Sequence, residues 1–563
     1  MSAWHFGNTT VRSPFRLREG LLAIKTCDLE GKIRGAEGDV NLRKCLGSVR
    51  LVKLGDDQTN SVGRKWRSAM EKMGFIIPSV ADSSIQELIG IPDHVSQNGL
   101  RLIETDNLQT WHECFLRALI AYRINDNKFN PFFFVISLML KLYEKTGSSK
   151  LTKDEMGLFA QFSNENSSAD NMADEIVAYR SSLSALKGRE RKRFIDEKYK
   201  MLGGNKQTLS SDYPDVNFRY LKATGLFKSS RTSILLDDDK LIIAKAINNN
   251  EWKPTSLIEY YQGLCNGAPL PTDNVEVAKS TITAFARQLE SFGIVVSLDE
   301  IEKLTEVSDI NAKRHELEAE LFKIRERDYA RTQAESVEEI IAYIELLMTP
   351  RSTSKTLANG TEVEIPSSER PAYFEWIVWR SFLAINSIVN PPWESRNFKV
   401  DPDFKPISHA ASGSSDLIFE FDDFVLVVEV TLTTSSRQEA AEGEPVRRHV
   451  ANYVQKYEPL GKQVYGLFMA IVIDTNTANT FRLGEWYLPD DTQIHVQIVP
   501  VALKDFKELL EAKKENPNEL LSQIKAILIE CRAEMTKPAP EWKRFISERF
   551  CAIATNLKNN DHD

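Results

Sequence analysis

The chain has 563 residues, a length that favours two to four domains over one small binding module. Hydrophobic residues make up 42% and charged residues 27%, which excludes wholesale disorder and collagen-like structure. The formal net charge of −9, taken alone, argues against a protein that coats nucleic acid electrostatically. The sequence contains no long apolar run and no signal-like start, so we expect a cytoplasmic protein without a membrane anchor.

Several familiar chemical motifs are missing. The six cysteines form no close pair in the sequence, so they predict neither a disulfide framework nor a cysteine-based zinc site. The eight histidines are dispersed and include no HExxH. The phosphate-binding patterns GxxxxGK(S/T) and GxGxxG are absent, which weakens interpretations based on nucleotide hydrolysis or a dinucleotide cofactor.

The first part of the chain is basic and helical in pattern. Residues 1–70 hold 13 Lys and Arg against 7 Asp and Glu, opposite in sign to the whole chain. Helical spacing of apolar residues follows over 66–76 and 110–124. Residues 131–145 are mostly apolar but too few to span a bilayer, so they predict a buried helix.

A second basic stretch, 187–232, holds 12 Lys and Arg against 5 Asp and Glu, with aromatic residues interleaved. Within it, 217–227 followed by 229–240 predicts a helix, a glycine-containing stop and a short strand pair, as in a winged helix. A basic helix is ordinarily a solvated face. Here the basic helix occurs with aromatic residues and a basic tip at Lys228 and Arg231, which makes contact with DNA an equal alternative.

Residues 296–348 are charged, helical in pattern and free of Pro and Gly, with a narrow apolar stripe. They predict long connecting helices that divide the chain into two parts. After a polar loop over 349–371, alternating helix and strand patterns continue to the end.

The most informative segment is 415–435, whose two β-rich halves flank Asp422 and Asp423 and predict a hairpin. If those two residues form the turn, Asp416 lies directly opposite Glu429, with Cβ atoms about 4.5–5.5 Å apart. Opposed carboxylates repel, so we expect a compensating cation. Mg²⁺ fits because it typically takes only one or two protein carboxylates. The alternative for an arbitrary acid pair is solvation at the rim of the sheet.

Two helix-like segments flank this hairpin. Residues 373–385 are apolar but carry Glu375. Residues 438–458 begin with a cluster of charged side chains. These are Glu442, Glu444, Arg447, Arg448 and His449.

These segments carry a family resemblance. FEW (374–376), HAAS before Asp416, EVT (429–431) and GEPVRRH (443–449) occur in an order that resembles the catalytic half of AlwI-like type IIS restriction endonucleases. That group also includes site-specific nicking endonucleases. Its catalytic half is similar to the PD-(D/E)XK nuclease fold, a mixed sheet with flanking helices. The resemblance is dense over 373–450 and looser elsewhere.

The resemblance implies an active site and a reaction. Asp416 and Glu429 match the metal-binding acids, Glu375 and Glu442 match further active-site glutamates, and His449 matches a neighbouring histidine. The implied reaction is Mg²⁺-dependent hydrolysis of DNA that leaves a 5′-phosphate and a 3′-hydroxyl.

One position departs from the general nuclease pattern. Thr431 stands where many PD-(D/E)XK enzymes have the lysine that orients the attacking water, and the AlwI-like enzymes resemble this chain in that substitution. The candidates for the water-orienting group are His449, Glu442 and Lys456.

We therefore expect an α/β multidomain protein with a mainly helical N-terminal half and a PD-(D/E)XK-type C-terminal half. The expected parts are a first DNA-recognition subdomain over 1–150, a second, winged-helix-like one over 151–295, a helical linker over 296–348 and a catalytic nuclease domain over 349–563.

The expected function is sequence-specific cleavage of double-stranded DNA at a fixed offset from an asymmetric site. One catalytic centre cuts one strand at a time, so double-strand cleavage needs transient dimerisation or a second, small nuclease subunit. The alternative outcome is strand-specific nicking by this chain as the large subunit of a heterodimer. Two other hypotheses are a DNA-binding regulator with a degenerate nuclease half, and a metal-dependent phosphodiesterase acting on RNA or nucleotides. The candidate DNA contacts are Arg16, Arg18, Arg64, Lys65, Arg67, Arg191, Lys192, Arg193, Lys228 and Arg231.

Overall fold

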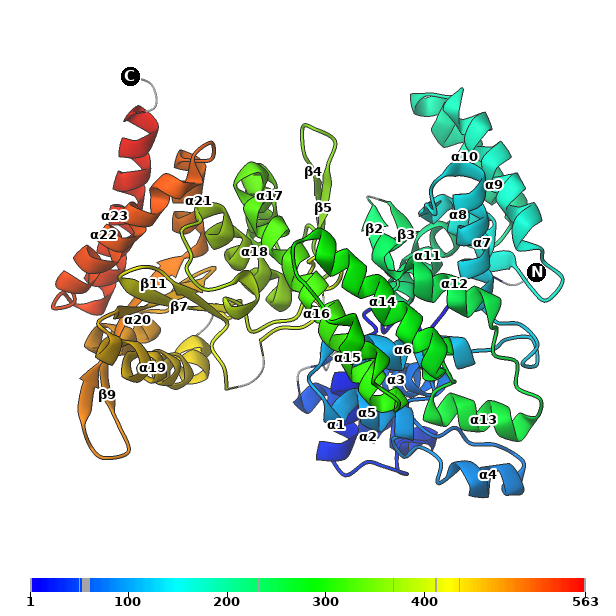
Figure 1. Ribbon diagram of the computed structural model, residues 1–563. Coiled ribbons are helices and arrows are strands. Elements are labelled where there is room, and N and C mark those ends of the chain that lie inside the picture. The colour runs from blue at the N-terminus through cyan, green and yellow to red at the C-terminus, as the bar shows by residue number, and fades with distance from the viewer. Residues whose placement is uncertain are drawn as a thin grey trace. The chain divides into compact units, whose positions relative to one another are not determined.

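The computed structural model describes residues 3–49, 51–52, 61–230, 232–367, 369–410, 413–434 and 436–560. It is a mixed α/β protein that is mostly helical (Figure 1). The chain forms two compact units. The first is Met1–Phe322 with Asp401–Asp403, and the second is Lys323–Val400 with Phe404–Asp563.

The boundary between the units falls inside one long helix, α16 (Val307–Arg331). The expected linker segment 296–348 therefore contributes helices to both units. Its last helix, α17 (Val337–Met348), is largely buried, because its apolar residues pack in the second unit.

The first unit consists of helices and one small sheet. Its helices before the sheet are α1 (Arg16–Thr26), α2 (Gly35–Ser48), α3 (Ser61–Lys72), α4 (Ser83–Ile89), α5 (Gln97–Glu104), α6 (Leu108–Ala121) and α7 (Pro131–Thr146). Then come β1 (Leu151–Thr152), α8 (Lys153–Leu158), α9 (Ala169–Ser184), α10 (Gly188–Leu202), α11 (Tyr213–Ala223), β2 (Phe227–Ser230), β3 (Ser233–Leu236), α12 (Leu241–Asn249), α13 (Leu257–Asn266), α14 (Val275–Ser291) and α15 (Leu298–Glu302).

The helix, glycine stop and strand pair expected over 217–240 are present. Helix α11 ends just before Gly225, whose φ of 71° favours glycine, and a Cβ there would lie 2.6 Å from His112 Nδ1. Strands β2 and β3 pair antiparallel, with Phe227 opposite Leu236, and β1 pairs with β3. The local order is confirmed.

A partly buried charge cluster joins α6 to α16 in the first unit. Glu113 lies 2.8 Å from Arg117, 2.7 Å from Arg314 and 3.0 Å from the His315 ring. Burial raises the pKa of Glu113, but the His315 hydrogen bond and the two arginine charges outweigh it and hold this pKa below its ordinary value. The acid is therefore ionised and stabilises the packing of both helices.

Two cysteines of this unit are paired, which corrects the sequence-based expectation that they form no disulfide. Cys27 and Cys45 form a disulfide with Cα atoms 6.3 Å apart. They are 18 residues apart in sequence, and the packing of α1 against α2 brings them together. The spacing alone did not indicate this pairing.

The second unit contains the main sheet. Its elements after α17 are β4 (Ser354–Thr356), β5 (Glu362–Glu364), α18 (Arg370–Ile385), β6 (Leu417–Glu420), β7 (Phe424–Thr431), α19 (Arg437–Tyr457), β8 (Gln463–Ala470), α20 (Thr475–Leu483), β9 (Glu485–Tyr487), β10 (Gln493–His495), β11 (Gln497–Ala502), α21 (Leu503–Ala512), α22 (Leu520–Ala533) and α23 (Ala539–Asn560). The four-stranded sheet has the order β11-β8-β7-β6. Strands β7, β8 and β11 run parallel, and β6 is antiparallel to β7.

Helices cover both faces of this sheet because its central strands are apolar on both sides. Val425 and Val427 lie in a core cluster with Val450 of α19. On the opposite face, Phe419 stacks on Phe382 of α18 with ring centroids 4.5 Å apart. Figure 1 shows α19 along one side of the strands. The side chains of the odd-numbered residues of β7 therefore point towards α19.

No helix within the described ranges is both long enough and apolar enough to cross a membrane.

Candidate active site

The hairpin of β6 and β7 has the predicted register. Leu417 pairs with Val428, and the backbone N–H of Phe421 donates to the carbonyl of Phe424 at 2.9 Å, so the turn contains two residues. The next pair along this register is Asp416 and Glu429. The carboxylates thus face each other on the side of the sheet that α19 covers.

Asp416 is fixed from two sides, by strand β7 and by the loop that contains Asn397. Its Oδ2 accepts from the N–H of Val430 at 2.7 Å. Asn397 holds the backbone of Asp416 from the other side, because its N–H donates to the Asp416 carbonyl at 3.1 Å and its Nδ2 donates to the Ser415 carbonyl at 2.6 Å. Asn397 was not predicted, and no short-range motif marks it.

Glu429 is held from α19. Its Oε1 lies 2.7 Å from Nδ1 of His449, and both side chains are buried. The histidine's other ring nitrogen, Nε2, is buried without a hydrogen-bond partner among the described residues. This nitrogen is therefore available to a water or a ligand.

Glu442 lies two helical turns before His449 on the same face of α19. It accepts a hydrogen bond from the Thr431 hydroxyl at 2.8 Å. Thr431 and Glu429 are two residues apart on β7. Glu442 of α19 contacts Thr431, and His449 of the same helix contacts Glu429. The helix therefore runs antiparallel to β7 along the acid pair.

Glu375 comes from the opposite helix, α18. It is only 6% exposed, and its Oε2 accepts from the N–H of Ala410 at 2.8 Å. The sequence pattern shows one acid on an apolar helix. Its burial and its backbone donor, in the loop before β6, come from the folded chain. Ala411 and Ser412 of the HAAS block lie outside the described residues.

The electrostatics of the cluster oppose ionisation. Burial, and then the charge of Asp416, raise the pKa of Glu375 well above its ordinary value. Burial, and then the charge of Glu429, do the same to the pKa of Asp416. Burial, and then the charge of Glu442, raise the pKa of Glu429. Like charges in a buried site raise pKa values in this way, and a bound cation would reverse the effect.

The donor set suits a hard divalent ion. Asp416 and Glu429 supply carboxylate oxygens, and each carboxylate has about four lone-pair sites, so one hydrogen bond does not exhaust it. Among the described residues, no three Asp, Glu, His or Cys side chains converge on one point as a closed metal site would need. An ion held by two carboxylates, with water and phosphate in its other positions, fits this arrangement.

The third candidate for the water-orienting group lies apart from these contacts. Lys456 is exposed near the end of α19, and its Nζ lies 4.8 Å from the ring centroid of Tyr457. Tyr453, which sequence reasoning missed, lies closer, because its hydroxyl is 3.5 Å from Oγ of Ser415, next to Asp416. Its position one helical turn after His449 could have indicated it.

Three basic candidates near the N-terminus are engaged inside the first unit. Arg16 donates to a backbone carbonyl. Arg18 donates to backbone carbonyls, and its guanidinium lies 4.5 Å from a ring centroid of Trp111. Arg67 pairs with Asp39 at 3.5 Å. These side chains stabilise the helical packing.

The other candidates differ in exposure. Arg64 is exposed and Lys65 is half-buried on α3. Lys228 on β2 pairs with Asp238 at 2.7 Å. Arg231, at the tip of the hairpin, lies outside the described residues.

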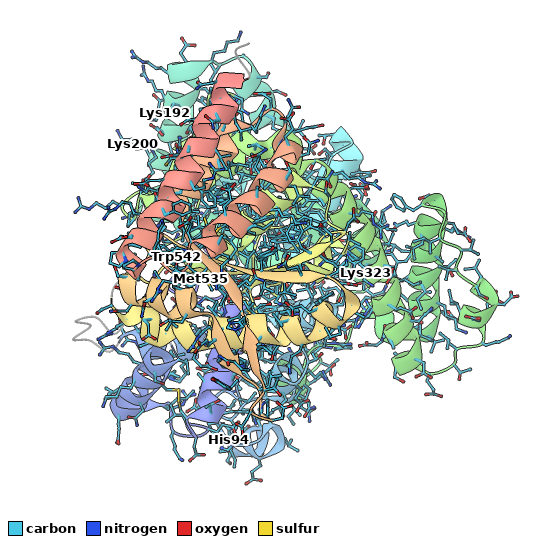
Figure 2. All side chains as sticks on the ribbon, turned by 90° about the vertical axis from the view of Figure 1, so that its left-hand side faces the viewer. His94, Lys192, Lys200, Lys323, Met535 and Trp542 are labelled. Carbon is cyan, nitrogen blue, oxygen red and sulfur yellow. A yellow bond between two sulfur atoms is a disulfide. The ribbon has the colours of Figure 1, made fainter. Side chains whose placement is uncertain are left out.

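Helix α10 presents the most exposed set of cations. Its Tyr199 is buried in a small core cluster, while Phe194 and Ile195 are half-buried against that cluster. The remaining surface of the helix carries exposed basic residues, two of which, Lys192 and Lys200, are labelled in Figure 2. The full set is Arg189, Arg191, Lys192, Arg193, Lys198 and Lys200.

Comparison with known proteins shows similarity to one family and to solved structures. A family model described as AlwI restriction endonuclease matches residues 71–509. Among solved structures, the chain is similar to the small subunit (R.BspD6I2) of the heterodimeric restriction endonuclease R.BspD6I. The two are 26% identical, the match covers 38% of this chain and 98% of that one, and the TM-score is 0.29. No curated protein matches the chain.

Proposed function

The chain belongs to the AlwI restriction endonuclease family, and from that premise we propose that it is a Mg²⁺-dependent type IIS endonuclease of double-stranded DNA. A member of this family is a DNA nuclease, a hydrolase of phosphodiester bonds. The observation that carries the finer proposal is the acid cluster in which half-buried Asp416 lies opposite buried Glu429, with half-buried Glu442 and buried Glu375 beside them.

In this proposal, Asp416 and Glu429 hold Mg²⁺ beside the scissile phosphate. When bound, the ion neutralises phosphate charge and lowers the pKa of a bound water. The Val430 N–H and His449 orient these two carboxylates before DNA arrives, which reduces the entropy cost of reaching the reactive geometry. The water oxygen bonds to phosphorus while the bond to the 3′ oxygen breaks. The water gives up a proton and the leaving 3′ oxygen takes one up, so the products are a 5′-phosphate and a 3′-hydroxyl.

We assign sequence recognition to the first unit. The order of α7, β1, α8, α11, β2 and β3, with β1 and β2 on either side of β3, supports a winged-helix-like arrangement with α9 and α10 inserted. The cations on α11 give weaker support to a role of this arrangement in DNA recognition. Arg219 pairs with Asp215 at 3.0 Å, and Lys222 pairs with Asp401 at 3.0 Å, so both are engaged within this unit. The exposed basic face of α10 supports contact with DNA phosphates.

The division into two compact units supports cleavage outside the recognised sequence, since recognition and cleavage then belong to different parts of the chain. The described residues contain one cluster of this kind, which supports cutting of one strand per binding event. Strand-specific nicking is therefore the second candidate function. Double-strand cleavage would need a second copy or another nuclease subunit.

The test uses long duplex DNA incubated with the protein and Mg²⁺, followed by sequencing of the ends. Ends at a constant offset from one short motif support the proposal, and a supercoiled plasmid separates nicked from linear product. Absence of cleavage, or cleavage unchanged by Asp416→Ala and Glu429→Ala, would refute it. DNA binding without cleavage by the wild-type protein would instead favour a regulator with a degenerate nuclease half.

A further inference from the structure

Thr431 stands at the position where many PD-(D/E)XK nucleases have a lysine. The hydrogen bonds of its hydroxyl have a defined direction. The Thr431 side chain is buried, and its Oγ1 accepts from the N–H of Thr433 at 3.2 Å. A hydroxyl has one proton, and the Thr431 hydroxyl donates it to Glu442 Oε1, 2.8 Å away. Thr431 thus fixes one oxygen of Glu442.

The start of α19 is fixed relative to the end of β7, which presets this contact. Gln438, one helical turn before Glu442, is fully buried. Its Nε2 donates to the carbonyls of Thr433 at 2.6 Å and Val472 at 2.9 Å. Its Oε1 accepts from the N–H of Asp474 at 2.9 Å. The end of β7, the start of α19 and the segment after β8 are therefore joined through one side chain.

The other two candidates for orienting the attacking water differ from Glu442 in their contacts. His449 Nδ1 is bonded to Glu429, and Lys456 is exposed over Tyr457. Glu442 lies close enough to the acid pair that its charge acts on both Asp416 and Glu429. It combines proximity to the pair with a fixed orientation, and its carboxylate can accept a hydrogen bond from a water.

We propose that Thr431 and Glu442 together replace the missing lysine. Glu442 contacts the attacking water through a hydrogen bond, and Thr431 is the positioning residue that orients Glu442. This inference rests on the proposed nuclease function. It predicts that the Thr431 hydroxyl affects the rate of the cleavage step and not the affinity for DNA.

The test compares Thr431→Val with Thr431→Ser in the full-length protein. Loss of the hydroxyl should lower kcat by about 10- to 100-fold with the KM for DNA unchanged, whereas serine should restore most of kcat. Thr477→Val is the matched control, because it removes a buried hydroxyl that has no hydrogen-bond partner among the described residues. Thermal melting of all three variants identifies any loss that is due to unfolding.

A double-mutant cycle with Glu442→Gln separates a positioning role from a structural one. If Thr431 acts through Glu442, Thr431→Val should have little further effect on kcat in the Glu442→Gln background. Additive losses, or a Thr431→Val variant as active as wild type, would overturn this inference alone. A wild-type protein that does not cleave DNA would overturn the proposed function together with it.

Discussion

Replacing Asp416 with Asn should stabilise the second unit while abolishing cleavage. Half-buried Asp416 lies opposite buried Glu429, and removal from water together with mutual repulsion raises the pKa of Asp416 well above its ordinary value. An amide keeps the size of the side chain and an acceptor oxygen for the Val430 N–H, but it removes one of the two like charges. The variant therefore loses a repulsion and keeps the hydrogen bond.

The expected gain follows from the spacing of the pair. Two charges about 5 Å apart interact by about 3 kcal/mol at an effective dielectric constant near 20. His449 beside Glu429 and the N–H group on Asp416 offset part of this repulsion. We expect the free energy of unfolding to rise by about 1–3 kcal/mol without metal, which corresponds to roughly 3–10 °C in Tm.

The pH dependence has a definite sign. Because the pKa of Asp416 is raised on folding, the folded state holds its proton more tightly than the unfolded state. The destabilisation is complete above the raised pKa and vanishes below the ordinary value of 3.8. The advantage of Asp416→Asn should therefore be largest at alkaline pH and shrink as the pH falls towards about 4.

Calorimetric scans in EDTA at about pH 8 and about pH 5 measure this effect. Asp422→Asn, at the exposed turn of the same hairpin, is the control and should leave Tm unchanged. Added Mg²⁺ should raise the Tm of wild type, because a ligand that binds only the folded state stabilises it, and should not raise that of Asp416→Asn. A variant that melts at or below the wild-type temperature at about pH 8 would refute the reasoning, as would an advantage that grows on acidification.

Three further outcomes are expected. Glu375→Gln should keep the bond from the Ala410 N–H but lower kcat at least about tenfold with DNA affinity unchanged, as measured in steady-state cleavage assays. The triple variant Arg189→Gln, Lys192→Gln and Lys200→Gln should weaken DNA binding without Mg²⁺ and reduce the slope of log K against log salt by roughly 1–3, and an unchanged slope would remove α10 from the interface. Glu113→Gln should destabilise the first unit by about 3 kcal/mol in denaturant titrations, because its arginine partners stay buried. Since the pKa of Glu113 is lowered on folding, this difference should shrink below about pH 4.5, and a constant difference would contradict the assignment.

The hairpin and its acid pair could be predicted because they depend on local spacing. A two-residue turn at Asp422 and Asp423 fixes every cross-strand partner, so the opposition of Asp416 and Glu429 follows from counting residues. The position of Glu442 and His449 on one face of α19 follows in the same way from helical periodicity. The resemblance carried by residues 373–450 is confirmed by the family match.

Contacts between distant segments could not be predicted, because no short-range period encodes them. The bond from Ala410 to Glu375 spans 35 residues, and the clamp of Asn397 on Asp416 depends on the path of a loop. The basic stretch 1–70 shows the same limit. Its positive charge can be counted, but Arg18 and Arg67 are engaged in internal contacts that only packing reveals.

The sequence by itself determined the elements, the hairpin register, the family and the candidate acids, because these depend on period, turn length and residue type. Tertiary structure alone decided which groups hold those acids, which cations remain exposed, and that α16 is shared by two units. The physical reason is that burial and pairing are properties of segments brought together by folding. The net charge of −9 illustrates it, since that sum cannot distinguish an exposed cation on α10 from a paired one in the core.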